Sequence, residues 1–164
     1  MLAELSRGAR RVRLEPDDSV RNLVAKELGL RSVSALTCDL DVRPWMDGVE
    51  ITGRINAVVG QVCGVSLDDF EQAVVGEVDL RLVPAGSVNA PEPSTDVEID
   101  PFSEHPDPPE VLQDDRVDLA AIAQEHLALA IDPFPRKPGA VFEYSPAATE
   151  ESPFAVLSRL RDAG

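Results

Sequence analysis

Residues 36–63, LTCDLDVRPWMDGVEITGRINAVVGQVC, decide the fold of this chain. Apolar and polar residues alternate in both halves of the stretch, which is the pattern of a strand that buries one face. In the first half the apolar face comprises Leu36, Cys38, Leu40 and Val42, and in the second it runs from Val49 to Cys63. Met46-Asp47-Gly48-Val49, between the two halves, is typical of a tight hairpin. The stretch therefore predicts two long antiparallel strands.

The predicted sheet extends on the C-terminal side, and a helix precedes it. A third strand is expected from Phe70 to Val83, whose apolar residues again share one face. Pro16 and the acidic residues after it favour a helix over residues 17–28, and Gly29 favours its end. The expected fold class is α+β: an antiparallel β-meander of three long strands, with helices packed on one face.

A different kind of sequence begins at Pro84, although residues 1–164 are expected to form a single domain. Residues 84–110 hold seven of the 14 prolines, so residues 84–116 are expected to form a flexible, acidic, Pro-rich loop. A short additional strand through Val97, Ile99 and Phe102 is left open within it.

Two further helices are expected beyond the loop. Asp118 is placed to cap a helix from Leu119 to Ile131. A second Pro-rich connection, residues 133–151, leads to an amphipathic C-terminal helix over residues 152–162, with Phe154, Leu157 and Leu160 on one side.

The formal net charge of −15 is distributed unevenly. Residues 1–54 hold nine basic and nine acidic residues, whereas residues 55–164 hold six basic and 21 acidic ones. Nucleic-acid-binding surfaces neutralise phosphates with Lys and Arg, so strong direct binding of nucleic acid by this chain alone is not expected. A basic protein partner fits the charge better, and a purely solubilising role is the alternative that charge leaves open.

The chain is expected to be cytoplasmic and to have no contact with a membrane. No run of apolar residues approaches the roughly 18 that a membrane-spanning helix needs. The first residues also lack the apolar segment of a secretory signal.

The hairpin geometry argues against a disulfide between Cys38 and Cys63. With Asp47-Gly48 at the turn, Cys38 is expected to face Ala57, six residues before Cys63. At about 3.3 Å per residue this separates the two cysteines by roughly 20 Å, whereas a disulfide needs Cα atoms within about 7 Å. Both cysteines are interpreted as small buried hydrophobic residues.

The sequence offers no pattern typical of an enzyme, and we expect no catalytic residues, no cofactor and no metal site. His105 and His126 lie far apart, and neither has a second ligand at helical spacing. Glycine-rich phosphate-binding motifs are absent. Ser66, beside two aspartates, would need a histidine base that the sequence does not place there.

Two segments stand out from the acidic background. Residues 133–139 carry Phe134, Pro135, Arg136 and Lys137 on a stiff Pro-framed segment, and these four are the candidate contacts to a partner or to RNA. A structured turn that pairs with nearby acids is the alternative interpretation. Residues 153–157 begin an amphipathic helix that either docks in a groove of a partner or packs on its own domain. The Arg7–Arg13 cluster is a second candidate for a contact.

Four blocks, in order, resemble the YceD family, bacterial proteins named for large ribosomal RNA subunit accumulation and formerly a family of unknown function. Gly53 to Cys63 resembles the family's long strand that leads into its cysteine motif, and Val117 to Ala130 resembles its helix. Asp132 to Gly139 is similar to the Asp-Pro-aromatic-Pro-Arg-Lys-Pro-Gly stretch of alphaproteobacterial-type members. Ser152 to Leu160 resembles the family's C-terminal Pro-Phe-Ala-x-Leu-x-x-Leu.

The chain departs from this pattern at the cysteine motif, as a divergent member would. Many members have Cys-x-x-Cys there, with further His and Cys near the Pro-rich block, whereas here the second position is Ser66 and residues 133–143 hold no His or Cys. The resemblance therefore implies no complete set of metal ligands for this chain. The positions that match the family motifs are Cys63, Ser66, Leu67, Pro153, Phe154 and Leu157.

The resemblance implies a non-enzymatic factor that supports accumulation or processing of large-subunit ribosomal RNA and ribosome assembly. With a net charge of −15, the expected partners are ribosomal precursor particles or basic ribosomal proteins, with ribosomal RNA contacted through them. An acidic, chaperone-like protein that binds one basic protein is the alternative.

Overall fold

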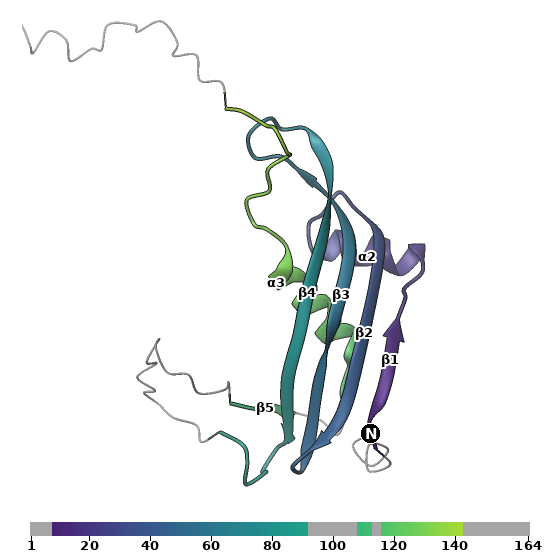
Figure 1. Cartoon of the computed structure of the whole chain (residues 1–164), viewed down its shortest axis with the longest axis vertical. Helices are drawn as coiled ribbons and strands as arrows, with labels where there is room; N and C mark the ends of the chain where they lie inside the picture. The colour runs from purple at the N-terminus through teal and green to yellow at the C-terminus, as the bar shows by residue number, and fades with distance from the viewer. Residues whose placement is uncertain (1–7, 92–107, 113–115, 143–164) are drawn as a thin grey trace, which may run out of the picture.

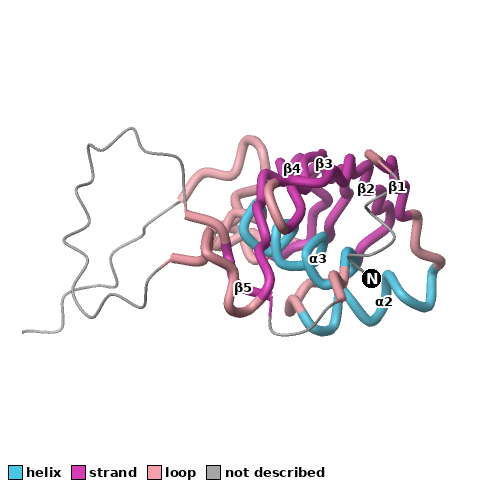
Figure 2. The backbone as a smooth tube through the Cα atoms, turned by 90° about the horizontal axis from the view of Figure 1, so that it is seen from below, coloured by secondary structure: helices cyan, strands magenta, loops and turns pink. Residues whose placement is uncertain are grey.

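The computed structural model of the chain describes residues 8–91, 108–112 and 116–142 (Figure 1). They form a five-stranded sheet in sequence order: β1 (Arg10–Leu14), β2 (Ser32–Trp45), β3 (Gly48–Val62), β4 (Asp69–Pro84) and β5 (Glu110–Leu112). Strands β1 to β4 are antiparallel neighbours, and β5 is parallel to β4. Helices α2 (Asp18–Glu27) and α3 (Leu119–Ala130) lie on the same side of the sheet (Figure 2). The α+β architecture is thus confirmed, with a mixed sheet.

The meander follows from the alternation of the sequence. Trp45 pairs with Gly48, so Met46 and Asp47 alone form the turn, and Met46 adopts the positive φ of 52° that such turns require. The predicted hairpin and the predicted third strand are both confirmed. One irregularity, between Val33 and Ala35, shifts the register of β2 against β3.

The core lies between the sheet and the two helices. Leu40, Ile51, Ile55 and Val59 are fully buried on the inner face, and Leu127 of α3 packs into the same cluster. The two predicted helices that fall on described residues both form, with ends within one residue of those expected. The Asp17 carboxylate accepts the amide of Val20 at the start of α2, and the Asp118 carboxylate accepts two amides at the start of α3.

The structure adds two strands that the sequence patterns did not predict. Part of the N-terminal basic cluster forms β1, in which Arg11 and Arg13 form ion pairs with Asp41 and Asp39 of β2. These two arginines therefore hold the edge of the sheet. The other added strand is β5, which pairs with the last three residues of β4.

The register of the hairpin differs from the expected one by two residues. Cys38 faces Ile55 and not Ala57, because the two turn residues are Met46 and Asp47 and not Asp47 and Gly48, and moving the turn by one residue moves each strand partner by two. Cys38 is therefore even further along the strand from Cys63, and both cysteines are free thiols.

Several predictions lie outside the described residues. These are most of the acidic loop 84–116, the short strand through Val97, Ile99 and Phe102, and the C-terminal helix 152–162 with Pro153, Phe154 and Leu157. Neither α2 nor α3, the helices of the described residues, is long and apolar enough to cross a membrane.

Candidate functional site

The loop between β3 and β4 closes tightly around Cys63. The amide of Cys63 donates to the carbonyl of Asp68 at 2.9 Å, and the amide of Leu67 donates to the carbonyl of Cys63 at 3.0 Å. Leu67 adopts a φ of 60°, a conformation that branched or bulky residues rarely adopt, and its side chain is 77% exposed. The loop therefore turns sharply and presents an apolar side chain to solvent.

The Pro-rich segment that follows α3 is joined to this loop by three contacts. The amide of Gly64 donates to the carbonyl of Pro135 at 2.9 Å. The amide of Lys137 donates to the sulfur of Cys63 at 3.3 Å, and the Lys137 ammonium lies 3.1 Å from a carboxylate oxygen of Asp68. We call the group of Cys63, Gly64, Ser66, Asp68, Pro135 and Lys137 the Cys63 clamp, since it holds two segments that are far apart in sequence.

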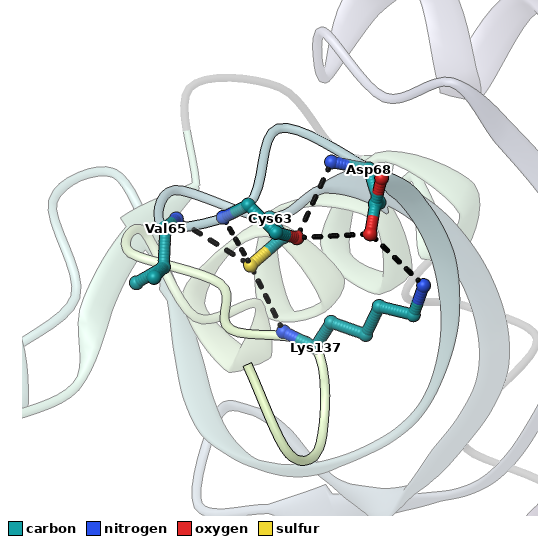
Figure 3. Close-up of polar contacts among 5 residues, drawn as sticks. Cys63, Val65, Asp68 and Lys137 are labelled. Atoms are coloured by element: carbon teal, nitrogen blue, oxygen red, sulfur yellow. Dashed lines mark hydrogen bonds and ion pairs between the residues drawn. The ribbon is translucent and has the colours of Figure 1, made fainter. Parts of the chain in front are cut away.

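The sulfur of Cys63 is the centre of the clamp. It accepts backbone N–H groups from Val65 and Ser66, each at 3.4 Å, and from Lys137 at 3.3 Å (Figure 3). Donors aimed at a sulfur favour its anionic form. Hydrogen bonding by the Ser66 side chain, and then by the backbone amides of Ser66 and Lys137, lowers the pKa of Cys63 from 9.0 to about 6. The hydrogen bonds to the sulfur therefore favour the thiolate form of Cys63.

Both cysteines are buried, as expected, but the two thiols have opposite environments. Cys38 is 1% exposed among core side chains, and burial, followed by the charge of Asp39, raises the pKa of its thiol to about 11. Cys63 is just as buried but lies outside the hydrophobic cluster, among amide donors. Its role is that of a hydrogen-bond acceptor rather than of a small apolar residue.

Gln61 adds a second tie between β3 and the segment after α3. Its side chain is only 7% exposed and donates to the carbonyl of Asp132 at 3.3 Å. Asp132 in turn accepts the amide of Phe134 at 2.8 Å, which orders the start of the Pro-rich segment. The side-chain oxygen of Gln61 has no hydrogen-bond partner among the described residues.

The four candidate contact residues divide into two pairs. Pro135 and Lys137 belong to the clamp, so the alternative of a structured turn that pairs with nearby acids applies to Lys137. Phe134 is 79% exposed, and Arg136 is exposed and has no ion-pair or hydrogen-bond partner among the described residues. The clamp thus fixes the backbone next to two exposed side chains, Phe134 and Arg136.

The other family-motif positions of this region also take part. The hydroxyl of Ser66 donates to the Asp68 carboxylate at 3.1 Å, and a second bond, from the Asp68 amide to that hydroxyl, closes the turn. Together with Lys137, this lowers the pKa of Asp68. Sequence reasoning had singled out Ser66 and Lys137 but missed Asp68 as their common partner. No signal in either block indicated this contact, and the helix block, Val117 to Ala130, separates them in the sequence.

These donors do not fit a bound metal. The Cys63 sulfur is already surrounded by three amides, the Ser66 hydroxyl is bound to Asp68, and the Asp68 carboxylate is neutralised by Lys137. Within residues 8–91, 108–112 and 116–142, no three His, Cys, Asp or Glu side chains gather as a metal site would require. The clamp joins the two segments with protein groups alone.

Comparison with known proteins agrees with the four sequence blocks. The family model described as "Large ribosomal RNA subunit accumulation protein YceD" matches residues 51–161, more than half of the chain. The chain belongs to the YceD family. No curated protein and no solved structure gives a match. The matched residues of this YceD-family chain include both sides of the clamp, Cys63 and Lys137, and the family's name connects it with large-subunit ribosomal RNA.

Proposed function

We propose that this YceD-family chain is a non-enzymatic, cytoplasmic factor that supports accumulation of large-subunit ribosomal RNA by binding a basic protein of the precursor particle. The observation that carries the proposal is the family match, which spans the whole of the candidate site from β3 to the Pro-rich segment. The proposal concerns assembly rather than chemistry, because the most activated group, Cys63, is fully buried and occupied by backbone donors.

Charge favours a protein as the direct partner. The chain carries a net charge of −15, so phosphates would be repelled over most of its surface. At the clamp, two of the three nearby cations are engaged, Lys137 with Asp68 and Arg31 with Asp69, which leaves Arg136 alone without an ion pair among the described residues. Basic ribosomal proteins have the complementary charge.

Phe134, Arg136 and Leu67 are the surface that we assign to this contact. All three are exposed, and they belong to the two segments that the clamp holds together. A stiff backbone loses little conformational freedom on binding, and aromatic and Arg side chains are enriched at interface hot spots.

The proposal is tested by deleting the gene and measuring mature and precursor large-subunit ribosomal RNA. We expect the precursor to rise and the mature form to fall, and the protein to sediment with precursor large-subunit particles. Unchanged RNA together with sedimentation only as free protein would refute the proposal.

The contact surface is tested separately with Phe134→Ala and Arg136→Ala in the deletion strain. Both side chains are exposed, so the variants should fold normally and yet fail to restore mature RNA. Leu129→Ala and Lys26→Ala are matched controls, since they also remove an exposed apolar side chain and an exposed cation, but from the helices. Equal complementation by all four variants would remove the surface from the proposal.

A second candidate is a chaperone-like role for one basic protein, which the charge of −15 favours independently of ribosome assembly. The purified chain would then bind that protein at a fixed stoichiometry, with affinity that falls steeply with salt. It would not sediment with precursor particles, which distinguishes this candidate from the first.

A further inference from the structure

Strand β4 has a long open edge. On one side, residues Asp69 to Leu82 pair with β3 without interruption. On the other side, β5 pairs only with the last three residues, Leu82 to Pro84 (Figure 1). No other described strand lies beside residues 69–81, so half of their backbone N–H and C=O groups face outward with no partner in the sheet.

The open edge has one of the usual features that prevent strand pairing, charged side chains, and lacks the others. Edge strands are commonly protected by charged side chains, a proline, a bulge or short length. Here residues 69–83 contain no proline and no lysine, and the register against β3 runs without a bulge. The segment is also long, since β4 has 16 residues. Within the described residues, this edge is therefore open to another strand of complementary charge.

The solvent-facing side of the same edge is acidic. Four of its alternate residues are exposed acids: Asp69, Glu71, Glu77 and Asp79. Arg31 and Arg54 pair with Asp69 and Glu77, whereas Glu71 and Asp79 have no ion pair among the described residues. The one cation in the row, Arg81, is bound to Glu50.

The inner side of β4 rests on helix α3. Gly76 is buried against α3, where an added Cβ would lie 3.2 Å from the Ala130 Cβ and 3.3 Å from the His126 carbonyl oxygen. A strand added beside β4 would therefore have one face toward the helix layer and the other toward solvent, next to the acids. It would need apolar residues on the first face and basic residues on the second.

We infer that the open edge of β4 binds an extended segment of a basic protein by strand addition, with its alternate Lys or Arg residues facing Glu71 and Asp79. Backbone hydrogen bonds give the affinity in this mode of recognition, and the side chains of alternate residues give the specificity. The inference rests on the proposed function for the identity of the partner as a protein of the precursor particle.

The acids on this edge disfavour the other two occupants. If two copies of the chain paired through β4, the acidic rows would face each other, which destabilises cross-strand pairs. RNA cannot extend a sheet, and its phosphates would be repelled by the same acids.

The test uses a synthetic peptide of alternating Lys and Val, 11 residues long, and the full chain. Two further peptides carry backbone N-methyl groups, one on every Lys and one on every Val. All three peptides have the same charge. Because the backbone N–H groups of alternate residues in a strand point to the same side, the methyl groups face β4 in only one of the two methylated peptides, and that peptide cannot donate hydrogen bonds to β4. We expect that peptide alone to lose at least about tenfold in affinity. Equal binding of all three would mean attraction of charges only and would overturn the inference.

The site on the chain is located with Glu71→Lys/Asp79→Lys and a control, Glu125→Lys, which changes an exposed acid on α3. The double variant should lose the peptide, and the control should retain it. Bound peptide should slow amide exchange in residues 69–81 and leave that of β1 unchanged. Equal affinity of both variants, or protection away from β4, would overturn the inference.

The same double variant separates this inference from the proposed function. If deletion of the gene changes the levels of mature and precursor ribosomal RNA, and the double variant restores the wild-type levels fully, the proposed function stands and the β4 site is wrong. If deletion has no effect on ribosomal RNA but the peptide binds at β4, the site stands and the proposed function is wrong.

Discussion

The backbone amide of Lys137 donates a hydrogen bond to the sulfur of Cys63, 3.3 Å away across 74 residues of sequence. This bond, with the one between Gly64 and Pro135, makes the β3–β4 loop and the segment after α3 a single structural unit. Because Phe134 and Arg136 alternate with the clamp residues Pro135 and Lys137, these two bonds hold the backbone that carries both side chains.

Replacing Cys63 with Ala should loosen the Pro-rich segment. Three partly buried backbone donors, the amides of Val65, Ser66 and Lys137, would lose their acceptor. We expect amide exchange at Lys137 to become at least about tenfold faster, as measured by NMR. Cys38→Ala is the control, since it also removes a buried thiol but one that lies in the core. Amide exchange at Lys137 should keep its wild-type rate in this variant. Unchanged exchange in Cys63→Ala would contradict the role assigned to the sulfur.

The thiolate also predicts how stability depends on pH. The pKa of Cys63 falls from 9.0 to about 6 on folding, so between these values the unfolded chain binds a proton that the folded chain does not. The contribution of Cys63 to stability therefore rises with pH from about 6, is complete above about 9, and is lost as the pH falls through about 6.

The measurement for this window is urea unfolding at several pH values, in the wild type and in Cys63→Ser. The difference in free energy of unfolding between the two proteins should grow between pH 6 and pH 9, because other groups titrate equally in both. A difference that is constant over this range would show that the sulfur carries no charge in the folded state.

The N-cap of α3 offers a separate prediction. Asp118 accepts the amides of Ala120 and Ala121 at 3.0 and 3.1 Å, so Asp118→Ala should lower stability by about 1 kcal/mol. Asp118→Ser retains a capping oxygen and should lose less, while Glu125→Ala, which removes an exposed acid from the same helix, should have little effect. Chemical unfolding of the three variants checks this order. If Asp118→Ala and Glu125→Ala behave alike, the cap is not what stabilises the start of α3.

Periodicity was sufficient to predict the elements that bury one face. The alternation of residues 36–63 and of Phe70 to Val83 fixed three strands, since a shift of one residue would expose the whole apolar face. Helix α3 was predictable because Asp118 caps its start and its apolar residues recur at helical spacing, so that they share one face. By contrast, β1 consists mainly of arginines whose strand conformation depends on Asp39 and Asp41 across the sheet, and no local pattern contains that information.

The candidate site was predictable only as two separate blocks. Resemblance placed Cys63 and Lys137 in family motifs, but nothing in either block indicates that an amide of one reaches the sulfur of the other. Alternation even misled, because Cys63 has the parity of the buried face and was interpreted as apolar. Its environment changes because β3 ends at Val62, so the next residue meets loop amides and not core side chains.

The closed end of the hairpin gives the sharpest prediction for the fold. A Cβ added at Gly48 would overlap the backbone carbonyl of Leu82 and lie 2.9 Å from the Cα of Val83, and backbone atoms of a central strand cannot move aside cheaply. Gly48→Ala should therefore cost on the order of 1–3 kcal/mol. Gly64→Ala is the matched control, since its added Cβ would lie 3.7 Å from the Pro135 carbonyl oxygen, an ordinary contact, and its φ is not in the left-handed region. It should stay within about 0.5 kcal/mol of the wild type. Equal unfolding midpoints for the two variants would mean that β3 and β4 are not packed as closely at Gly48 as their register requires.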